Sequence, residues 1–235
     1  YFELAGYGGA FFNAAVVLVI GYFMMHSHNT YFIGITMAAL FINAGYALWG
    51  KNPVNIWPLI LGTAIYAKVH SAKFGRYIYT ALFGTSLAPL ITEMGFLLPF
   101  SGPVNYLISI FIGVFIGYIL PPLSMHTASM HMGYNLFNVG FSAGIVAFAI
   151  VCILKSFGVE SQSVLIWQEA INPGIAIGLL VYFVIAFLYG LFLNNWSIKE
   201  LFAITRHPGR AVADFVLMDG EGPTLMNMAV VGIVS

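Results

Sequence analysis

Residues 121–144 read PPLSMHTASMHMGYNLFNVGFSAG. The stretch contains His, Met, Asn, Gly and Pro but no Lys, Arg, Asp or Glu, and it separates two long apolar segments. A loop in water normally carries charge, whereas irregular backbone at membrane depth is tolerated only where protein encloses it or it lines a wet cavity. We therefore expect a re-entrant or broken segment near residues 121–138, and we place the functional centre in this stretch.

The whole chain has the composition of a polytopic membrane protein. Of its 235 residues, 60% are hydrophobic and 7% are charged, and the mean hydropathy is +0.93. Soluble domains carry about 25% charged residues. The formal net charge is zero, so no basic face points to nucleic acid. The single cysteine, Cys152, excludes an intrachain disulfide and a cysteine metal cluster, and no cofactor is expected.

Apolar windows predict an all-α, polytopic transmembrane helical bundle with about seven spans and part of an eighth. The windows are residues 8–25, 31–49, 54–69, 77–98, 103–120, 140–154 and 175–193, with the last starting near residue 224. The window at 54–69 is the weakest, because it is short and contains Pro58. Such a bundle needs the lipid bilayer as its partner.

Six of the eight Lys and Arg residues fall in two connections, 68–76 and 199–210, and Lys51 and Lys155 fall in other connections. Whether 54–69 spans the membrane or dips in and returns, both connections lie on one side, which the positive-inside rule makes cytoplasmic. A short interfacial helix is expected at 197–205. Residues 155–172 are expected to form a surface loop that re-enters the membrane at Asn172 and Pro173.

The two ends of the chain resemble each other: FELAGYGGAFFNAAVVLVIG at 2–21 and FVLMDGEGPTLMNMAVVGIVS at 215–235. The match predicts that residues 1–214 form a first membrane repeat and that residues 215–235 begin a second, so that the chain is part of a longer protein. Seven spans between the copies would make the repeat inverted, as in many transporters. Six spans and a re-entrant piece would make it parallel. We favour the inverted form.

Polar side chains in or beside apolar segments define a predicted substrate pathway: Asn43, Glu93, His126, His131, Asn135 and Asn138. An intramembrane carboxylate such as Glu93 typically serves an ion or proton pathway, although Glu93 could instead reach the interface. The asparagines could equally hold helices together. The two histidines are five residues apart, which is not the i, i+4 spacing of a helical zinc site, so no metal is assigned.

The motif GVFIG, residues 113–117, matches GxxxG and favours close helix packing. Motifs for nucleotide binding and for a catalytic nucleophile are absent from the sequence. A catalytic role is therefore not predicted.

Three segments resemble a family of bacterial multi-pass membrane proteins that is known only as a domain of unknown function with tandem membrane repeats. They are KNPVNIWPLILGTAIYAK (51–68), ALFGTSLAPLITE (81–93) and HMGYNLFNVGFSAGIVA (131–147). The resemblance implies a multi-pass protein of the bacterial inner (cell) membrane and assigns no catalytic residue. The Asn- and Gly-containing segments are also faintly similar to urea transporters, whose full signature is absent.

These features favour an integral membrane transporter or channel for a small polar solute, neutral or cationic, with its site near residues 121–144 at mid-membrane. A structural or assembly subunit of a membrane complex is the alternative. A membrane-embedded enzyme that uses Glu93 with His126 or His131 is a third hypothesis, which lacks a recognisable motif. The sequence leaves homo-oligomerisation open.

Overall fold

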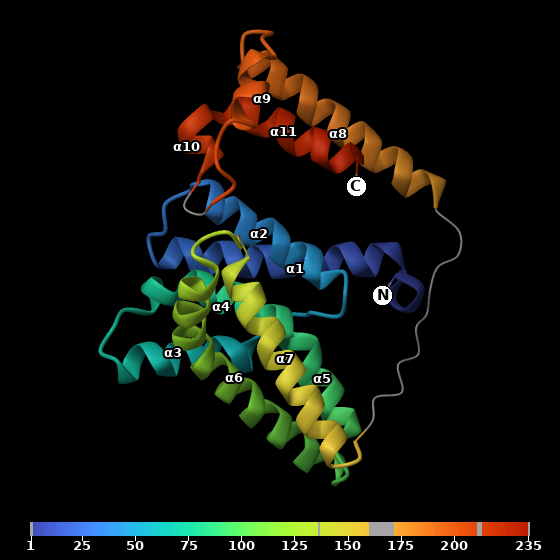
Figure 1. Ribbon diagram of the computed structural model, residues 1–235. Helices are drawn as coiled ribbons and strands as arrows, with labels where there is room; N and C mark the ends of the chain where they lie inside the picture. The colour runs from blue at the N-terminus through green and yellow to red at the C-terminus, as the bar shows by residue number, and fades with distance from the viewer. Residues whose placement is uncertain (1, 136, 160–171, 211–212, 235) are drawn as a thin grey trace. The chain divides into compact units, whose positions relative to one another are not determined.

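The computed structural model describes residues 2–135, 137–159, 172–210 and 213–234. The regular secondary structure in these ranges is helical throughout (Figure 1). The chain divides into two compact units. Unit 1 comprises Tyr1–Phe32 and Thr36–Val164, and unit 2 comprises Ile33–Ile35 and Leu165–Ser235.

The helices of unit 1 are α1 (Phe2–Ser27), α2 (Gly34–Ala47, which begins at the boundary with unit 2), α3 (Trp57–Val69), η1 (Phe74–Tyr77), α4 (Ile78–Gly84), η2 (Thr85–Leu87), α5 (Ala88–Leu97), α6 (Gly102–His131) and α7 (Asn138–Ser156). The helices of unit 2 are α8 (Pro173–Leu193), α9 (Lys199–Ile204), α10 (Phe215–Asp219) and α11 (Glu221–Val234). Every apolar window predicted from the sequence overlaps a helix.

Five helical segments of the described chain are long and apolar enough to cross a bilayer: Leu4–Ser27, Phe74–Leu97, Gly102–His131, Asn138–Ser156 and Pro173–Leu193. Helices α2, α3 and α11 contain 14, 13 and 14 residues, short of the roughly 20 that a spanning helix needs. The prediction of an all-helical fold is therefore confirmed, and five of its helical segments are candidate membrane spans. The predicted count of about seven spans and part of an eighth is not confirmed, because five helical segments meet the length and composition of a span.

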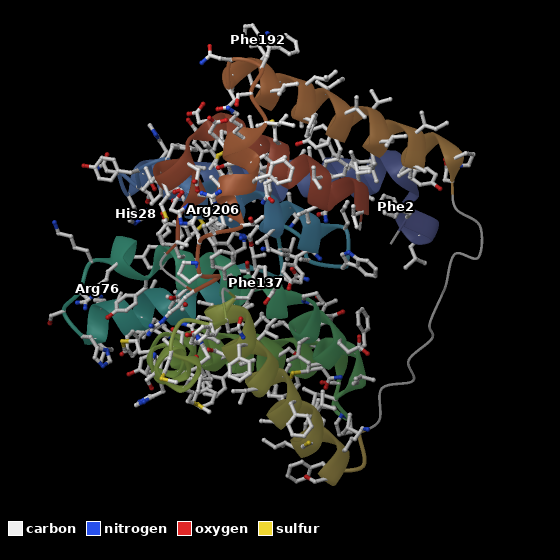
Figure 2. All side chains as sticks on the ribbon, turned by 45° about the horizontal axis from the view of Figure 1, so that its top comes forward. Phe2, His28, Arg76, Phe137, Phe192 and Arg206 are labelled. Atoms are coloured by element: carbon white, nitrogen blue, oxygen red, sulfur yellow. The ribbon has the colours of Figure 1, made fainter. Side chains whose placement is uncertain are left out.

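Helix α8 has the surface expected of a helix in contact with lipid. Its side chains consist almost entirely of carbon (Figure 2), and only Ala186 and Gly190 are buried. Gly190 lies against α11, where an added Cβ would approach the carbonyl oxygen of Gly222 to 2.7 Å. The two helices of unit 2 thus meet through small residues, which is how membrane helices pack closely.

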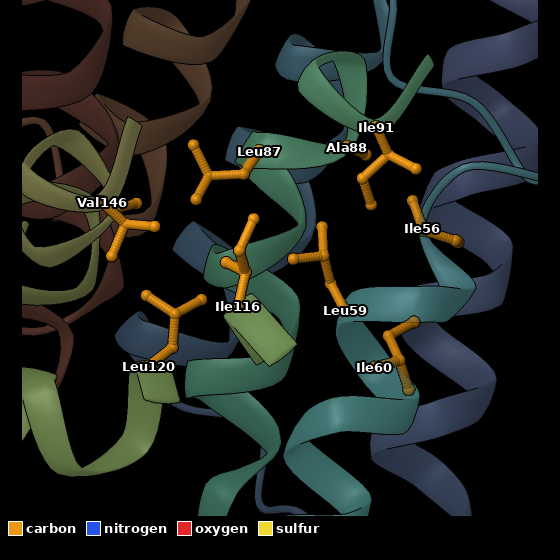
Figure 3. Packing of buried hydrophobic residues seen from close by; sticks show 10 residues of the cluster. Ile56, Leu59, Ile60, Leu87, Ala88, Ile91, Ile116, Leu120 and Val146 are labelled. Atoms are coloured by element: carbon orange, nitrogen blue, oxygen red, sulfur yellow. The ribbon is translucent and has the colours of Figure 1, made fainter. Parts of the chain in front are cut away.

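The main core of unit 1 lies between α3, α5, α6 and α7. Its buried side chains include Leu59 from α3, Ile91 from α5, Ile116 and Leu120 from α6, and Val146 from α7. Figure 3 shows these side chains converging between the helices. This core fixes α3 against α6 and places the loop that precedes α3 at the edge of the core.

The crossing of α3 and α6 depends on glycine. A Cβ on Gly117 would overlap the carbonyl oxygen of Leu59, and one on Gly62 would overlap that of Val114. Gly113, the other glycine of GVFIG, faces Pro58 and Ile91. The two backbones can therefore approach only where side chains are absent. The prediction of close packing at this motif is confirmed.

Helix α6 continues through Pro121 and Pro122 to His131, so the first half of the predicted broken segment near 121–138 is helical. The non-helical backbone is confined to the connection between α6 and α7, residues 132–137, of which residue 136 lies outside the described ranges. Proline lacks the N–H that would bond the carbonyl four residues earlier. For Pro121 that carbonyl belongs to Gly117, and the hydroxyl of Thr63 donates to it instead at 2.9 Å. A neighbouring helix thus compensates for the missing bond.

Two glycines give the ends of the chain the same local geometry. Gly6 interrupts α1 with φ 66° and ψ 166°, and Gly220 separates α10 from α11 with φ 92° and ψ 172°. Positive φ at extended ψ is accessible essentially only to glycine. Each of these glycines lies seven residues before an asparagine, Asn13 or Asn227.

A helix lies within the predicted range 197–205, as α9. The prediction for 155–172 falls largely on residues 160–171, outside the described residues. At the end of that segment, Asn172 caps α8 by accepting hydrogen bonds from the N–H groups of Gly174 and Ile175.

Candidate functional site

Lys51, in the loop between α2 and α3, lies inside unit 1. It is 1% exposed, and it is the largest of the fully buried side chains. Its Nζ donates hydrogen bonds to Asn43 Oδ1 on α2 and to Thr85 Oγ1 in η2, the latter at 2.5 Å. The Thr85 hydroxyl can in turn donate to the Leu82 carbonyl at 2.5 Å or to Asn43 Oδ1 at 3.1 Å.

A side chain of α1, Asn13, forms hydrogen bonds with the backbone at the end of α2 and in this loop. Asn13 Nδ2 donates to the carbonyl oxygens of Ala47 at 2.7 Å and Lys51 at 2.8 Å. Asn43 Nδ2 donates to the Ala39 carbonyl within α2. Helices α1 and α2, the loop and η2 therefore build one polar cluster, which we call the Lys51 cluster: Asn13, Asn43, Lys51 and Thr85.

Burial lowers the pKa of Lys51 from 10.5 to about 7, and loss of hydration is the only cause. The unfolded chain keeps this proton up to the ordinary pKa of lysine, whereas the folded chain releases it near pH 7. Between about pH 7 and pH 10.5 the unfolded state thus binds more protons. The contribution of this group to stability therefore rises with pH across that window and is constant below it.

A cleft of about 450 Å³ lies beside the same loop. Its surface is almost entirely apolar, and its size is within the range of small-molecule sites. Residues from the loop, α3, α5 and α6 line it: Asn52, Val54, Asn55, Trp57, Pro58, Leu61, Ile91, Thr92, Tyr106, Ser109 and Ile110.

Asn55 attaches the loop to the wall of the cleft. Its Nδ2 donates to the Gly50 carbonyl at 3.1 Å and to Thr92 Oγ1 at 3.0 Å, and its Oδ1 accepts from the N–H of Asn52. Asn52 Oδ1 accepts from the N–H of Asn55 in return. The short loop that buries Lys51 on one side therefore also shapes the cleft.

A second polar network closes the hairpin of α6 and α7. Asn138 Oδ1 accepts from Thr127 Oγ1 and from His131 Nε2, both at 2.8 Å, and Asn138 Nδ2 donates to the Ser124 carbonyl. The N–H groups of Gly133 and Asn135 both donate to His131 Nδ1. Nδ1 therefore accepts and Nε2 carries the proton. These polar groups thus serve as hydrogen-bond partners for one another.

The predicted pathway residues do not form one site. His131 and Asn138 bond directly, with Asn135 joined through its backbone, and Asn43 belongs to the Lys51 cluster. His126 is exposed on α6, away from the buried Ser124 and Thr127. Glu93 is exposed on α5.

Sequence reasoning missed Lys51, Thr85 and the cleft. Lys51 was interpreted as a charge in a connection, which is where bilayers place most lysines. A usable signal was present: the segment GKNPVNI, residues 50–56, places one cation directly before two asparagines without a nearby acid. Within the described residues, groups of three or more His, Cys, Asp or Glu side chains that could hold a metal are absent.

Five helical segments of the described residues that are long and apolar enough to cross a bilayer make this chain a multi-pass membrane protein. A family model described as "Protein of unknown function (DUF1576)" matches residues 1–156 and 193–235. The chain belongs to this family. Neither the curated proteins nor the solved structures contain a match.

Proposed function

We propose that this protein is a transporter or channel for a small solute. The observation that carries the proposal is the Lys51 cluster, an amine enclosed by uncharged polar groups among apolar helices. An ionisable group buried among membrane helices is costly and typically marks a substrate or ion pathway.

We place the solute at the cleft beside the loop rather than at residues 121–144. The polar side chains of the α6–α7 hairpin bond one another, and their geometry is that of a helix–helix connection. The cleft is largely apolar, and Thr92, Tyr106 and Ser109 are among the residues that line it. These features support a small uncharged solute that carries both an apolar part and a hydrogen-bonding group.

The internal repeat is part of this proposal. The matching segments at 2–21 and 215–235 each contain a short helix, a glycine with positive φ and a longer helix. The spacing from that glycine to the asparagine is the same in both. Repeats of this kind are common in transporters. The family resemblance supports placement in a bacterial cell membrane.

Filling the cleft is expected to block solute passage. In Ile110→Trp the indole would occupy the space between α3 and α6. Osmotic swelling of proteoliposomes with urea, glycerol and propionamide as probes measures the effect. We expect at least one probe to enter wild-type proteoliposomes faster than protein-free liposomes, and Ile110→Trp to return that rate to the protein-free value.

Leu107→Trp is the matched control. Leu107 is also on α6, but it is 67% exposed and lies outside the cleft lining. Its substitution should leave the rate unchanged. Equal rates for folded wild-type protein and protein-free liposomes with every probe would reject the transport proposal and favour a structural subunit. Unchanged passage in Ile110→Trp would reject the cleft as the route.

A further inference from the structure

The hydrogen bonds of Lys51 indicate which form of the side chain the fold accommodates. Nζ has two acceptors, Asn43 Oδ1 and Thr85 Oγ1. A neutral amine has two N–H groups and one lone pair, whereas an ammonium has three N–H groups. Within the described part of the chain, a third acceptor for Nζ is absent. The two available acceptors therefore match the neutral amine and leave one N–H of an ammonium unpaired.

The surroundings of Lys51 supply no compensating charge. The side chains that hold it come from α1, α2 and η2 and are uncharged: Asn13, Asn43 and Thr85. Tyr79, the titratable residue of α4, bonds Thr36 instead. Among residues whose side chains are described, no carboxylate lies within 4.0 Å of Nζ, since the one ion pair found there is His207 with Asp219. A buried charge without a partner is strongly disfavoured.

We propose that Lys51 is held as a neutral amine inside unit 1 and is the site at which this protein binds and releases a proton during transport. The coupling part of this proposal rests on the transport function proposed above. The amine lone pair takes a proton from water to form the ammonium, and the reverse step returns it.

Proton uptake must disturb the cluster. The third N–H of the ammonium needs an acceptor, which only entering water or a shift of α2 against η2 can supply. The Thr85 hydroxyl offers a local response, because it can donate either to Leu82 or to Asn43. Asn52, the next residue of the same loop, lines the cleft. Protonation of Lys51 is thereby connected to the wall of the cleft.

The test is an NMR titration of the protein in detergent micelles, with lysine labelled at Cε. We expect one Cε signal to titrate near pH 7, and we expect Lys51→Met to lack that signal. Lys51→Gln provides a second assignment variant, because its amide keeps two N–H donors and does not titrate. If Lys51 instead titrates at the ordinary value, about 10.4, the proposal is overturned.

Stability gives an independent readout. The Tm of the wild type relative to Lys51→Gln should rise between about pH 7 and pH 10.5, the interval over which only the unfolded chain holds the proton. Parallel Tm curves for the two proteins across this interval would contradict the proposal.

The two proposals fail in different experiments. The titration needs no transport, so it decides proton binding even if none of the three probes enters the proteoliposomes. Coupling between proton binding and transport is decided with a probe that enters the proteoliposomes. The entry rate of that probe should depend on pH near neutrality in the wild type and not in Lys51→Gln. The same pH dependence in both proteins would overturn the coupling role.

Discussion

Replacing Gly117 by alanine is expected to separate α3 from α6 and to destabilise the protein severely. The added Cβ would overlap the backbone of Leu59, at its carbonyl and Cα, and backbone cannot rotate away as a side chain can. Overpacking in a core costs ~1–3 kcal/mol, occasionally more, and we expect at least the upper end here. The measurement is the Tm and the yield of monodisperse protein in detergent.

Gly144→Ala is the matched control. Gly144 is also inside a long apolar helix, α7, but an added Cβ there meets no atom within 4 Å. The higher helix propensity of alanine should make this variant neutral or more stable by ~0.5–1 kcal/mol. Equal Tm values for the two variants would show that α3 and α6 do not cross at Gly117.

Asn43→Leu is expected to have the second large effect. It removes one of the two acceptors of Lys51 and leaves a buried N–H unpaired, which costs ~1–3 kcal/mol and more if the group is charged. Leucine also lacks the N–H donor that bonds Ala39. We expect a lower Tm at every pH and the largest loss below pH 7, where the folded chain would have to hold an ammonium.

The double variant Asn43→Leu/Lys51→Met separates this mechanism from a simple packing defect. Replacing both partners by apolar groups removes the unpaired donor, and such exchanges are often nearly neutral. The double variant should therefore be more stable than Asn43→Leu alone. Additive losses would show that Asn43 and Lys51 do not interact.

Much of the fold was predictable because the signals are local. Apolar windows gave the positions of the helices, since a helix buried in lipid must be apolar on all sides. The GVFIG motif identified the surface of α6 that packs tightly, because close approach excludes side chains. The stretch at 121–144 was recognised as polar and uncharged, but the pairing of His131 with Asn138 within it was seen only in the structure.

The errors came from interactions that link distant parts of the chain. Pro121 and Pro122 indicated a break, but the fold continues the helix because Thr63, in another helix, bonds the carbonyl of Gly117. Lys51 resembled a solvated charge because its acceptors, Asn43 and Thr85, come from separate helices. The exposure of Glu93 was likewise not visible from its apolar sequence neighbours, because it depends on how α5 packs.

The burial of Lys51 is the central claim, and amine acetylation of the folded protein in detergent tests it most directly. The other four lysines, Lys68, Lys73, Lys155 and Lys199, are exposed, so they provide internal controls. Mass spectrometry after digestion should find these four modified and Lys51 unmodified, with Lys51 becoming reactive once the protein is denatured. Modification of Lys51 in the folded protein at the rate of Lys68 would contradict the structure of the cluster and the functions proposed from it.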